Sequence, residues 1–598
     1  MTQIIPTGAQ VRRQVKGGAW PMWNDLAGAG MPLLGDPQSQ ALQPLALVTL
    51  PLSLPQAAGV TAGLRVLLAL VFFFLLMRRQ GLSEGAALFG SLAYGLGGFL
   101  LLWLNWPLAN SAALFPLVLY GLAITEERGA RRDFLLLIVA LTALALAGHP
   151  ETVLYVTIVG GLFALARLLR RERRERIRIL GRWALAAGIA FGLAAPALLP
   201  SAEFLSQTLR TRQVQARNAR MEDRSPLHPW QNAKAGKMAK ELFRQRFFTV
   251  FAPNAFGNSR YLSYWGHGNT NEDSAGFVGG AALLAALLAF TPQRRFPQEQ
   301  LFLGIAAASF VVAVQVPGVP QFLRHVPVLD QSASDHRRML MILVLALAYL
   351  GACTVERWRS GEGRPGRWAV TACGALLLGL ISWGYLSSPE VDDLLGLRRF
   401  WMGLGIATVA LTAVIFALKK QAGERLSWAL ATLVALELIV LHRPANPSMP
   451  REEFYPTTPV IGYLQQNAGS YRVAGLADRL LPNSSALYGL ADIRISNPFK
   501  PGMYVQALGP VSASSNTTEH ILIKPEHPLY QLLGVRYLIG RLRYQAAKGQ
   551  KSVFKDLGSR VFEREKVLER LFLPESAVAP EDQPWPEWLA SNRDFAAR

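Results

Sequence analysis

Long apolar segments, repeated along most of the chain, limit what this sequence can fold into. As a helix, a segment of about 20 apolar residues crosses the roughly 30 Å hydrocarbon core of a membrane. Hydrophobic residues make up 51% of the 598 positions and charged residues only 17%. We therefore predict an α-helical polytopic membrane protein. Its spans number about twelve: 59–77, 85–103, 108–125, 134–147, 152–169, 183–205, 276–290, 301–316, 340–355, 368–386, 400–418 and 426–441.

The connections between these segments alternate in charge. Every second connection is rich in Lys and Arg: 78–80, 126–132, 167–178, 292–296, 356–367 and 419–425. Cytoplasmic loops carry such an excess, so these connections are predicted to be cytoplasmic. An even number of spans then places the first loop and the C-terminal tail together on the extracytoplasmic side. The long connection 206–275 is also basic, but loops of that length escape the rule.

The net charge of +21 has the same explanation. The basic runs lie between apolar segments, so we predict the lipid bilayer as a partner and no nucleic acid. Cys353 and Cys373 lie in apolar stretches and are interpreted as small core residues, not as a disulfide or metal site. The chain has no GxxxxGK[ST], HExxH or CxxC motif, which leaves little support for ATP-driven pumping, zinc hydrolysis or thiol redox chemistry.

A change in composition after residue 441 marks a separate region. Beyond a Pro-rich linker, Thr458 as N-cap, Pro459 and Gly469 predict a helix, and short β-type runs follow. The first twenty residues read as loop without a signal peptide, so a span is expected either before the chain begins or from about residue 59. The predicted regions are a first extracytoplasmic loop (1–58), a membrane domain (59–441) and a soluble extracytoplasmic α/β domain (442–598).

Polar residues gather in the connections predicted to be extracytoplasmic. Charged groups at a membrane boundary are costly, so they tend to mark a ligand or one another. Alternatively, each one caps a helix or reaches out to water from a helix end, and His149 in "GHPE" is more often a helix-end residue than a ligand. The candidate substrate contacts are Trp23, Asn24, Gln38, His149, Glu151, Glu203, Asn254, Glu272, Asp273, His336, Arg337 and Arg338.

The opening stretch "PMWNDLAGAGMPLLGDPQSQ" contains two acids. A lipid-phosphate substrate that carries a sugar needs cationic groups for its phosphate, and a carboxylate to activate the acceptor hydroxyl. Asp36 is the first candidate for that catalytic acid and Asp25 the second, with Arg337 or Arg338 as the phosphate partner. The alternative is that Asp36 only caps the turn made by Pro37.

The stretch "GGAWPMWNDLAGAGMPLLGDPQSQALQPL" resembles the first extracytoplasmic loop of the YfhO family of bacterial membrane proteins. "LAGHPE", "LLPSAEFLSQ", "FFTVFAPNAFGN" and "NEDSAGFVGG" resemble its later loops in the same order, and "PVIGYLQQNAGSYRVAGL" and "LLGVRYLI" resemble its soluble tail. Two features depart from the family pattern: Asn24-Asp25 stands where Asn-Pro is usual, and "LQPL" replaces Tyr-Pro. A first span and its Asp are expected before Met1.

The resemblance implies a GT-C type glycosyltransferase in the bacterial cytoplasmic (inner) membrane. Such an enzyme takes a sugar from a polyprenyl-phosphate carrier and, by this resemblance, transfers it to an envelope glycopolymer or glycolipid. The sequence names no cofactor, and it leaves open whether a divalent cation bridges a carboxylate and the phosphate.

Two other classes of function remain open. A transporter or flippase of lipid-linked glycans would use the same cationic residues, and would be expected to show internal repeats and broken paired spans. No convincing repeat is visible. A non-catalytic envelope-assembly protein would rely on the soluble tail alone.

Overall fold

The computed structural model describes residues 3–127, 130–211, 213, 233–257, 264, 272, 274–291, 296–332, 334, 336–361, 365–387, 395–418, 423–512 and 522–570. The chain divides into two compact units, and each is described by itself. The first combines Met1–Ala58, Ala195–Arg217 and Met449–Arg598. The second, helical unit combines Gly59–Ala194 and Asn218–Ser448.

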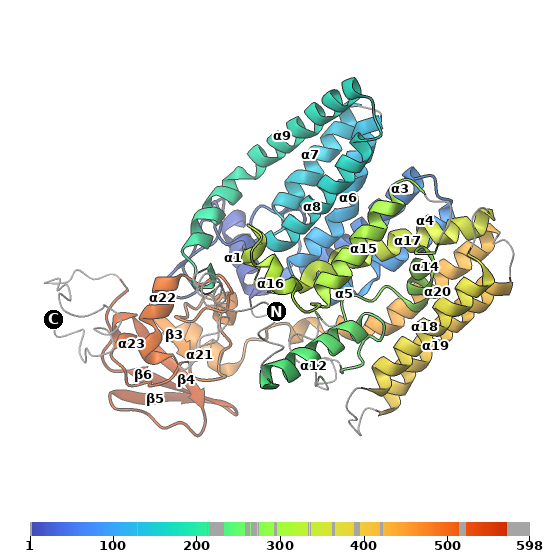
Figure 1. The fold of residues 1–598 in the computed structure, drawn as a ribbon. Coiled ribbons are helices and arrows are strands. Elements are labelled where there is room, and N and C mark those ends of the chain that lie inside the picture. The colour runs from blue at the N-terminus through green and yellow to red at the C-terminus, as the bar shows by residue number, and fades with distance from the viewer. Residues whose placement is uncertain are drawn as a thin grey trace. The chain divides into compact units, whose positions relative to one another are not determined.

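Helices dominate the second unit, as the apolar segments predict (Figure 1). All twelve predicted segments coincide with helices, some broken or shorter than expected. The helices are α3 (Leu54–Arg79), α4 (Glu84–Gly95), α5 (Gly98–Leu102), α6 (Leu108–Glu127), α7 (Arg131–Ala145), α8 (Pro150–Leu168), α9 (Arg173–Ser206), α12 (Ala233–Thr249), α14 (Gly280–Leu288), α15 (Glu299–Ala313), α16 (Val319–Leu323), α17 (Leu340–Ser360), α18 (Arg367–Leu386), α19 (Leu395–Leu418) and α20 (Glu424–His442). Helix α3 begins in residues that belong to the other unit, and α9 ends in such residues.

The predicted number of spans needs one qualification. Within the described residues, nine helical segments are long and apolar enough to cross a membrane. The segments predicted at 134–147, 276–290 and 301–316 form the shorter helices α7, α14 and α15, of 15, 9 and 15 residues. At a rise of about 1.5 Å per residue, these three are too short to cross roughly 30 Å of hydrocarbon alone.

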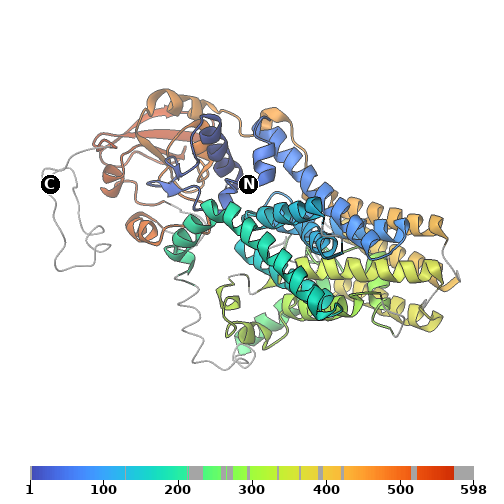
Figure 2. The same cartoon turned by 90° about the horizontal axis from the view of Figure 1, so that it is seen from above.

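Helix α17 forms the centre of this unit. It packs against α14, α15 and α4, and Figures 1 and 2 show it running among the other long helices. Its residues from Leu340 to Trp358 are buried, as expected for a helix that is apolar on every face. Close packing is possible where Gly90 of α4 meets Ala352, because a β-carbon at Gly90 would lie only 2.8 Å from the Ala352 side chain.

One end of this helical unit holds the residues of the basic connections. Arg357 of α17 pairs with Glu299 of α15 at 2.6 Å, and both side chains are buried. Arg167 of α8 pairs with Glu126 of α6. Two of the basic residues predicted as cytoplasmic, Arg167 and Arg357, thus lie in ion pairs that join neighbouring helices.

The other unit contains a four-stranded sheet. Together, this sheet and the helical unit confirm the predicted fold class, a polytopic membrane protein with an α/β domain. The strands are ordered β3-β4-β6-β5. Strands β3 and β4 are parallel and the other pairs are antiparallel. The predicted helix is α21, capped by the side chain of Thr458. The elements are α21 (Pro459–Asn467), β3 (Arg472–Gly475), α22 (Gly502–Ala507), α23 (Leu529–Leu532), β4 (Val535–Arg541), β5 (Gln550–Lys555) and β6 (Ser559–Arg564).

The opening segment belongs to this same unit, although residues 1–58 and 442–598 were predicted as separate regions. The Gly28 amide donates to the Asp492 carbonyl at 2.7 Å, and the Asp492 amide donates to the Leu26 carbonyl at 3.0 Å. The elements of the opening segment are α1 (Ile4–Lys16), β1 (Trp23–Asn24), β2 (Met31–Pro32), η1 (Pro37–Ser39) and α2 (Pro44–Val48).

The expectation that the first twenty residues form only loop is wrong for α1. Gly8 and a non-terminal proline, Pro6, weaken the helical signal in the sequence. Packing of Val11 in one apolar cluster with Leu33 and Leu34 offsets that weak propensity.

Candidate functional site

Helix α8 begins at a strongly polar junction in the helical unit. His149 is the N-cap residue, and its ring accepts from the Thr152 amide at 3.3 Å. Pro150 occupies the first helical position and Glu151 lies in the first turn. A fixed φ at the proline and a carboxylate near the positive end of the helix dipole both favour a helix start at this point.

The carboxylate of Glu151 is held by four side chains. Arg338 Nη1 lies 2.6 Å from Glu151 Oε2. The other oxygen, Oε1, accepts from the hydroxyl groups of Tyr155 at 2.7 Å, Ser332 at 2.8 Å and Ser334 at 2.6 Å. Because so many donors surround it, this carboxylate is fixed in one orientation.

A second carboxylate joins the same cluster. Glu272 Oε2 lies 3.2 Å from Arg337 Nη1, and its Oε1 lies 3.6 Å from Arg338 Nε. Arg338 therefore bridges Glu151 and Glu272. All four side chains are no more than 15% exposed. Burying two arginines and two carboxylates is costly unless they pair with one another or with a ligand.

Two histidines complete what we call the Glu151 cluster: His149, Glu151, Tyr155, Glu272, Ser332, Ser334, His336, Arg337 and Arg338. His149 Nε2 lies 3.2 Å from Arg338 Nη1. His336 Nδ1 lies 2.8 Å from the Tyr155 hydroxyl. Tyr155 thus connects Glu151 to His336.

Six of the sequence-predicted site residues meet in this cluster: His149, Glu151, Glu272, His336, Arg337 and Arg338. Three members of the cluster were not predicted from the sequence: Tyr155, Ser332 and Ser334. Tyr155 follows Glu151 by four positions on one helix, a spacing that places side chains side by side. Ser332 and Ser334 lie just before the predicted His336–Arg338 run, so proximity was the only available signal.

Asp36 lies in the other unit and has neutral partners. Its side chain caps η1 by accepting from the Gln38 amide at 2.9 Å, and it also accepts from Asn497 Nδ2 at 2.6 Å. The residue is 2% exposed. Burial raises the pKa of Asp36 to about 6, although both hydrogen bonds act in the opposite direction. The turn-capping alternative for Asp36 is therefore observed, and the carboxyl group remains able to titrate near neutral pH.

The remaining candidates in that unit have varied surroundings. Asp25 is half-exposed, and its carboxylate lies 3.6 Å from Arg13 Nη2. Asn24 is buried and accepts from the Leu26 amide at 3.1 Å. The Gln38 side chain accepts from Gln3 at 2.6 Å. Trp23 and Glu203 are exposed.

The last two candidates are Asn254 and Asp273. Asn254 adopts a left-handed backbone with φ of 61°, and its amide donates to Ser274 Oγ at 3.1 Å. Asp273 lies outside the described residues. Across the part of the chain that the structure describes, no group of three or more His, Cys, Asp and Glu side chains is placed to hold a metal ion.

Comparison with known proteins identifies the family. The model of the family described as "Bacterial membrane protein YfhO" matches residues 3–451, about three quarters of the chain. The chain belongs to the YfhO family. The resemblance seen in the loop motifs is thereby confirmed, and the protein is a bacterial membrane protein. None of the curated proteins matches the chain by sequence.

Two solved structures of one protein show a weak likeness over most of both chains. ArnT from Cupriavidus metallidurans bound to undecaprenyl phosphate aligns with a TM-score of 0.46 and 12% identity, covering 93% of this chain and 92% of that chain. The apo form of the same protein aligns with a TM-score of 0.41 and 13% identity, over the same shares. At such TM-scores, neither likeness decides the function of the YfhO family member.

Proposed function

We propose that this YfhO family protein is a membrane glycosyltransferase. It would transfer a sugar from a polyprenyl-phosphate carrier to an envelope glycopolymer or glycolipid on the extracytoplasmic face of the bacterial inner membrane. The observation that carries the proposal is the Glu151 cluster, in which two buried arginines meet at one end of a membrane-type helical unit. The GT-C type activity implied by the loop motifs supports it.

The proposed reaction is a displacement at the anomeric carbon of the donor sugar. The acceptor oxygen forms a bond to that carbon while the bond from the carbon to the phosphate oxygen breaks. The electron pair of the broken bond leaves with the polyprenyl phosphate, and the hydroxyl proton passes to a carboxylate. Such a reaction needs cations at the leaving phosphate and a base at the acceptor hydroxyl.

The arginines fit the first need. A guanidinium group can hold two phosphate oxygens at once, and Glu151 fixes the orientation of Arg338. The contact of Arg338 with Glu272 is longer, at 3.6 Å. A phosphate could replace Glu272 at this position at lower cost than it could replace Glu151.

Asp36 remains the first candidate for the base, with Asp25 second. An acid with a pKa of about 6 is mostly ionised at neutral pH and still accepts a proton readily. Asp25 is half-exposed, and its carboxylate lies 3.6 Å from Arg13 Nη2.

An assay with Arg338→Gln tests the proposal. Purified protein is mixed with radiolabelled polyprenyl-phosphate glucose and polyprenyl-phosphate N-acetylglucosamine, together with an envelope extract as acceptor. We expect transfer by the wild-type protein and a loss of about a hundredfold or more in Arg338→Gln, because the leaving phosphate loses a positioned cation.

Arg357→Gln is the matched control. It also removes an arginine that forms a buried 2.6 Å ion pair with a glutamate, but at the other end of α17. Equal loss of transfer per folded molecule in both variants would mean that Arg338 is only structural. Movement of the labelled lipid across the membrane without any bond to the acceptor would instead identify a flippase and overturn the proposal.

A further inference from the structure

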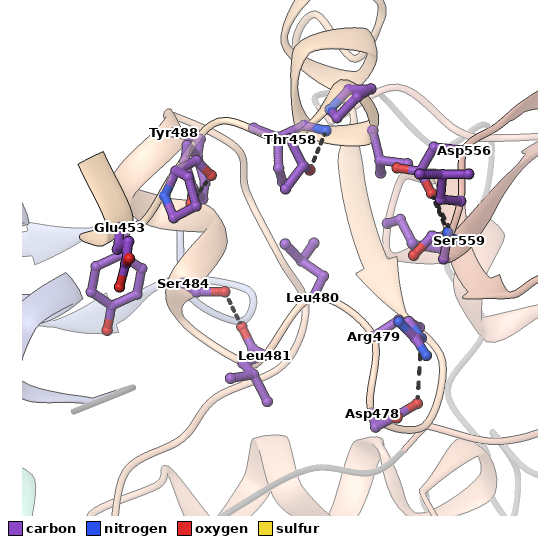
Figure 3. A pocket seen from close by; sticks show the side chains of 18 of the residues that line it. Glu453, Thr458, Asp478, Arg479, Leu480, Leu481, Ser484, Tyr488, Asp556 and Ser559 are labelled. Carbon is purple, nitrogen blue, oxygen red and sulfur yellow. Dashed lines mark hydrogen bonds and ion pairs between the residues drawn. The ribbon is translucent and has the colours of Figure 1, made fainter. Parts of the chain in front are cut away.

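The unit that contains the sheet has an open groove of about 730 Å³. Three stretches of chain line it: 449–461, 478–488 and 556–559, with Ile539 of β4 contributing from the sheet. Figure 3 shows the labelled side chains arranged around the open space. This volume lies within the range of sites that bind small molecules, and no role assigned above uses it.

Aromatic and apolar side chains form much of the wall. Phe454, Tyr455 and Tyr488 line the groove. The Tyr488 hydroxyl donates to the Pro456 carbonyl at 3.0 Å, which fixes that ring against the linker. Tyr455 has a left-handed backbone with φ of 54°. A bulky residue in this conformation is strained, and such strain often accompanies ligand contacts.

Polar groups with unused hydrogen-bonding capacity lie beside these rings. Asp556 Oδ1 accepts from the amides of Gly558 at 2.9 Å and Ser559 at 2.8 Å, and within the described residues the other carboxylate oxygen has no partner. Glu453 is exposed, and its carboxylate likewise has no partner among the side chains that the structure describes. The Arg479 guanidinium contributes a cation, and its Nε lies 3.6 Å from Asp478 Oδ1.

We infer that this groove binds a neutral saccharide chain. Flat aromatic rings can cover the apolar C–H face of a sugar ring, while carboxylates and a guanidinium hydrogen-bond to its hydroxyl groups. A lipid chain would leave those polar groups desolvated and unsatisfied. A polyanionic chain would meet the carboxylates of Glu453 and Asp556, which have no cationic partner among the described residues, against Arg479. The Asp478 carboxylate is already paired with Arg541 at 2.7 Å.

This inference rests on the proposed function and makes it more specific, because the saccharide would be the acceptor glycan. The groove is open, so a chain longer than the groove could pass through it. A transferase that holds its acceptor away from the reacting hydroxyl keeps a growing chain bound between transfers.

Saturation-transfer NMR on the full chain tests the inference without the donor lipid. The protein is placed in lipid nanodiscs, because maltoside detergents are themselves saccharides. The probes are maltotetraose and chitotetraose. We expect at least one of the two to give a saturable signal, and Tyr455→Ala and Arg479→Gln each to weaken its binding about tenfold or more.

Tyr471→Ala is the control, since Tyr471 belongs to the same unit but does not line the groove. Its binding should equal that of the wild type. Absence of signal from both probes, or unchanged binding in a folded Tyr455→Ala, would overturn the inference. So would groove-dependent binding of anionic vesicles or of a glycerol-phosphate oligomer. Saccharide binding by a protein without transferase activity would refute only the proposed function.

Discussion

Asp36 and Glu151 are two buried carboxylates in similar local sequences with different surroundings. One precedes a proline in "GDPQ" and the other follows a proline in "HPET", and each lies at the start of a helix. Asp36 accepts from two neutral donors, the Gln38 amide and Asn497. Glu151 accepts from a guanidinium and three hydroxyl groups.

The comparison shows that the role open to a buried acid depends on its hydrogen-bonding partners. A carboxylate beside a guanidinium is held as an anion and serves to orient that cation. A desolvated carboxylate with neutral partners can exchange a proton near neutral pH. In the proposed reaction, Glu151 would orient Arg338 and Asp36 would take the proton, and substitutions at the two sites distinguish these roles.

The largest expected effect is on transfer by Asp36→Asn. Asparagine keeps the size of the side chain and an oxygen that can still accept from the Gln38 amide. It removes the base, which should lower transfer about a thousandfold. The measurement is incorporation of radiolabelled sugar per folded molecule, at protein levels equal to the wild type.

Asp25→Asn tests the second candidate for the base by the same measurement. Asp25 is the second acid of the opening stretch, and it is half-exposed. If Asp36 is the base, replacement of Asp25 should change transfer by less than about threefold, because it removes only a half-exposed charge away from the reacting hydroxyl. Near-normal transfer in Asp36→Asn, together with a large loss in Glu272→Gln, would move the base to the helical unit and reverse the assignment.

A smaller effect concerns how the stability around Asp36 depends on pH. Burial raises the pKa of Asp36 from 3.8 to about 6, so the folded state binds the proton more tightly than the unfolded state. The resulting stability is fully present below pH 3.8 and is lost as the pH rises through 6. Lowering the pH from 7.5 to 5 should raise the local free energy of unfolding by about 1.4 kcal/mol.

Hydrogen exchange of peptides that cover residues 33–42 measures this change, after correction for intrinsic rates. The gain should vanish in Asp36→Asn, because asparagine does not titrate. A gain that persists in the variant would assign the pH dependence to another group and remove the evidence that Asp36 takes up a proton in this range.

Much of the helical unit could be predicted from the sequence because an apolar segment needs no distant partner to be recognised. The positions of breaks within these segments depended on packing between residues and could not be predicted. Residues 85–103 read as one segment, but the helix breaks between α4 and α5. At that break, a β-carbon on Gly97 would lie 2.7 Å from the Ala93 carbonyl. The grouping of the opening segment with the tail was also not predictable, since Asp36 and Asn497 are 461 positions apart.

The site was predictable where its residues were charged. His149, Glu151, Arg337 and Arg338 stand out because ionisable groups beside an apolar span are costly. The hydroxyl groups of Ser332 and Ser334 carry no such signal, because serine is common in any loop. Their role depends on their distance from Glu151, which only the fold provides.

Tyr155→Phe should lower transfer much less than Asp36→Asn, and it tests the orienting role of Glu151 alone. The change removes one hydroxyl that donates to Glu151 and also contacts His336. A lost hydrogen bond to a charged group should cost about 1–3 kcal/mol of stability. We expect a lower thermal midpoint and a fall in transfer of about three- to tenfold, because Glu151 then holds Arg338 less firmly.

Tyr349→Phe is the control: its hydroxyl donates to the Pro297 carbonyl at 2.8 Å. That variant should also melt earlier but keep its transfer rate per folded molecule. If both variants lose stability and neither loses transfer, the hydroxyl groups around Glu151 only stabilise the fold, and the orientation of Arg338 does not depend on them.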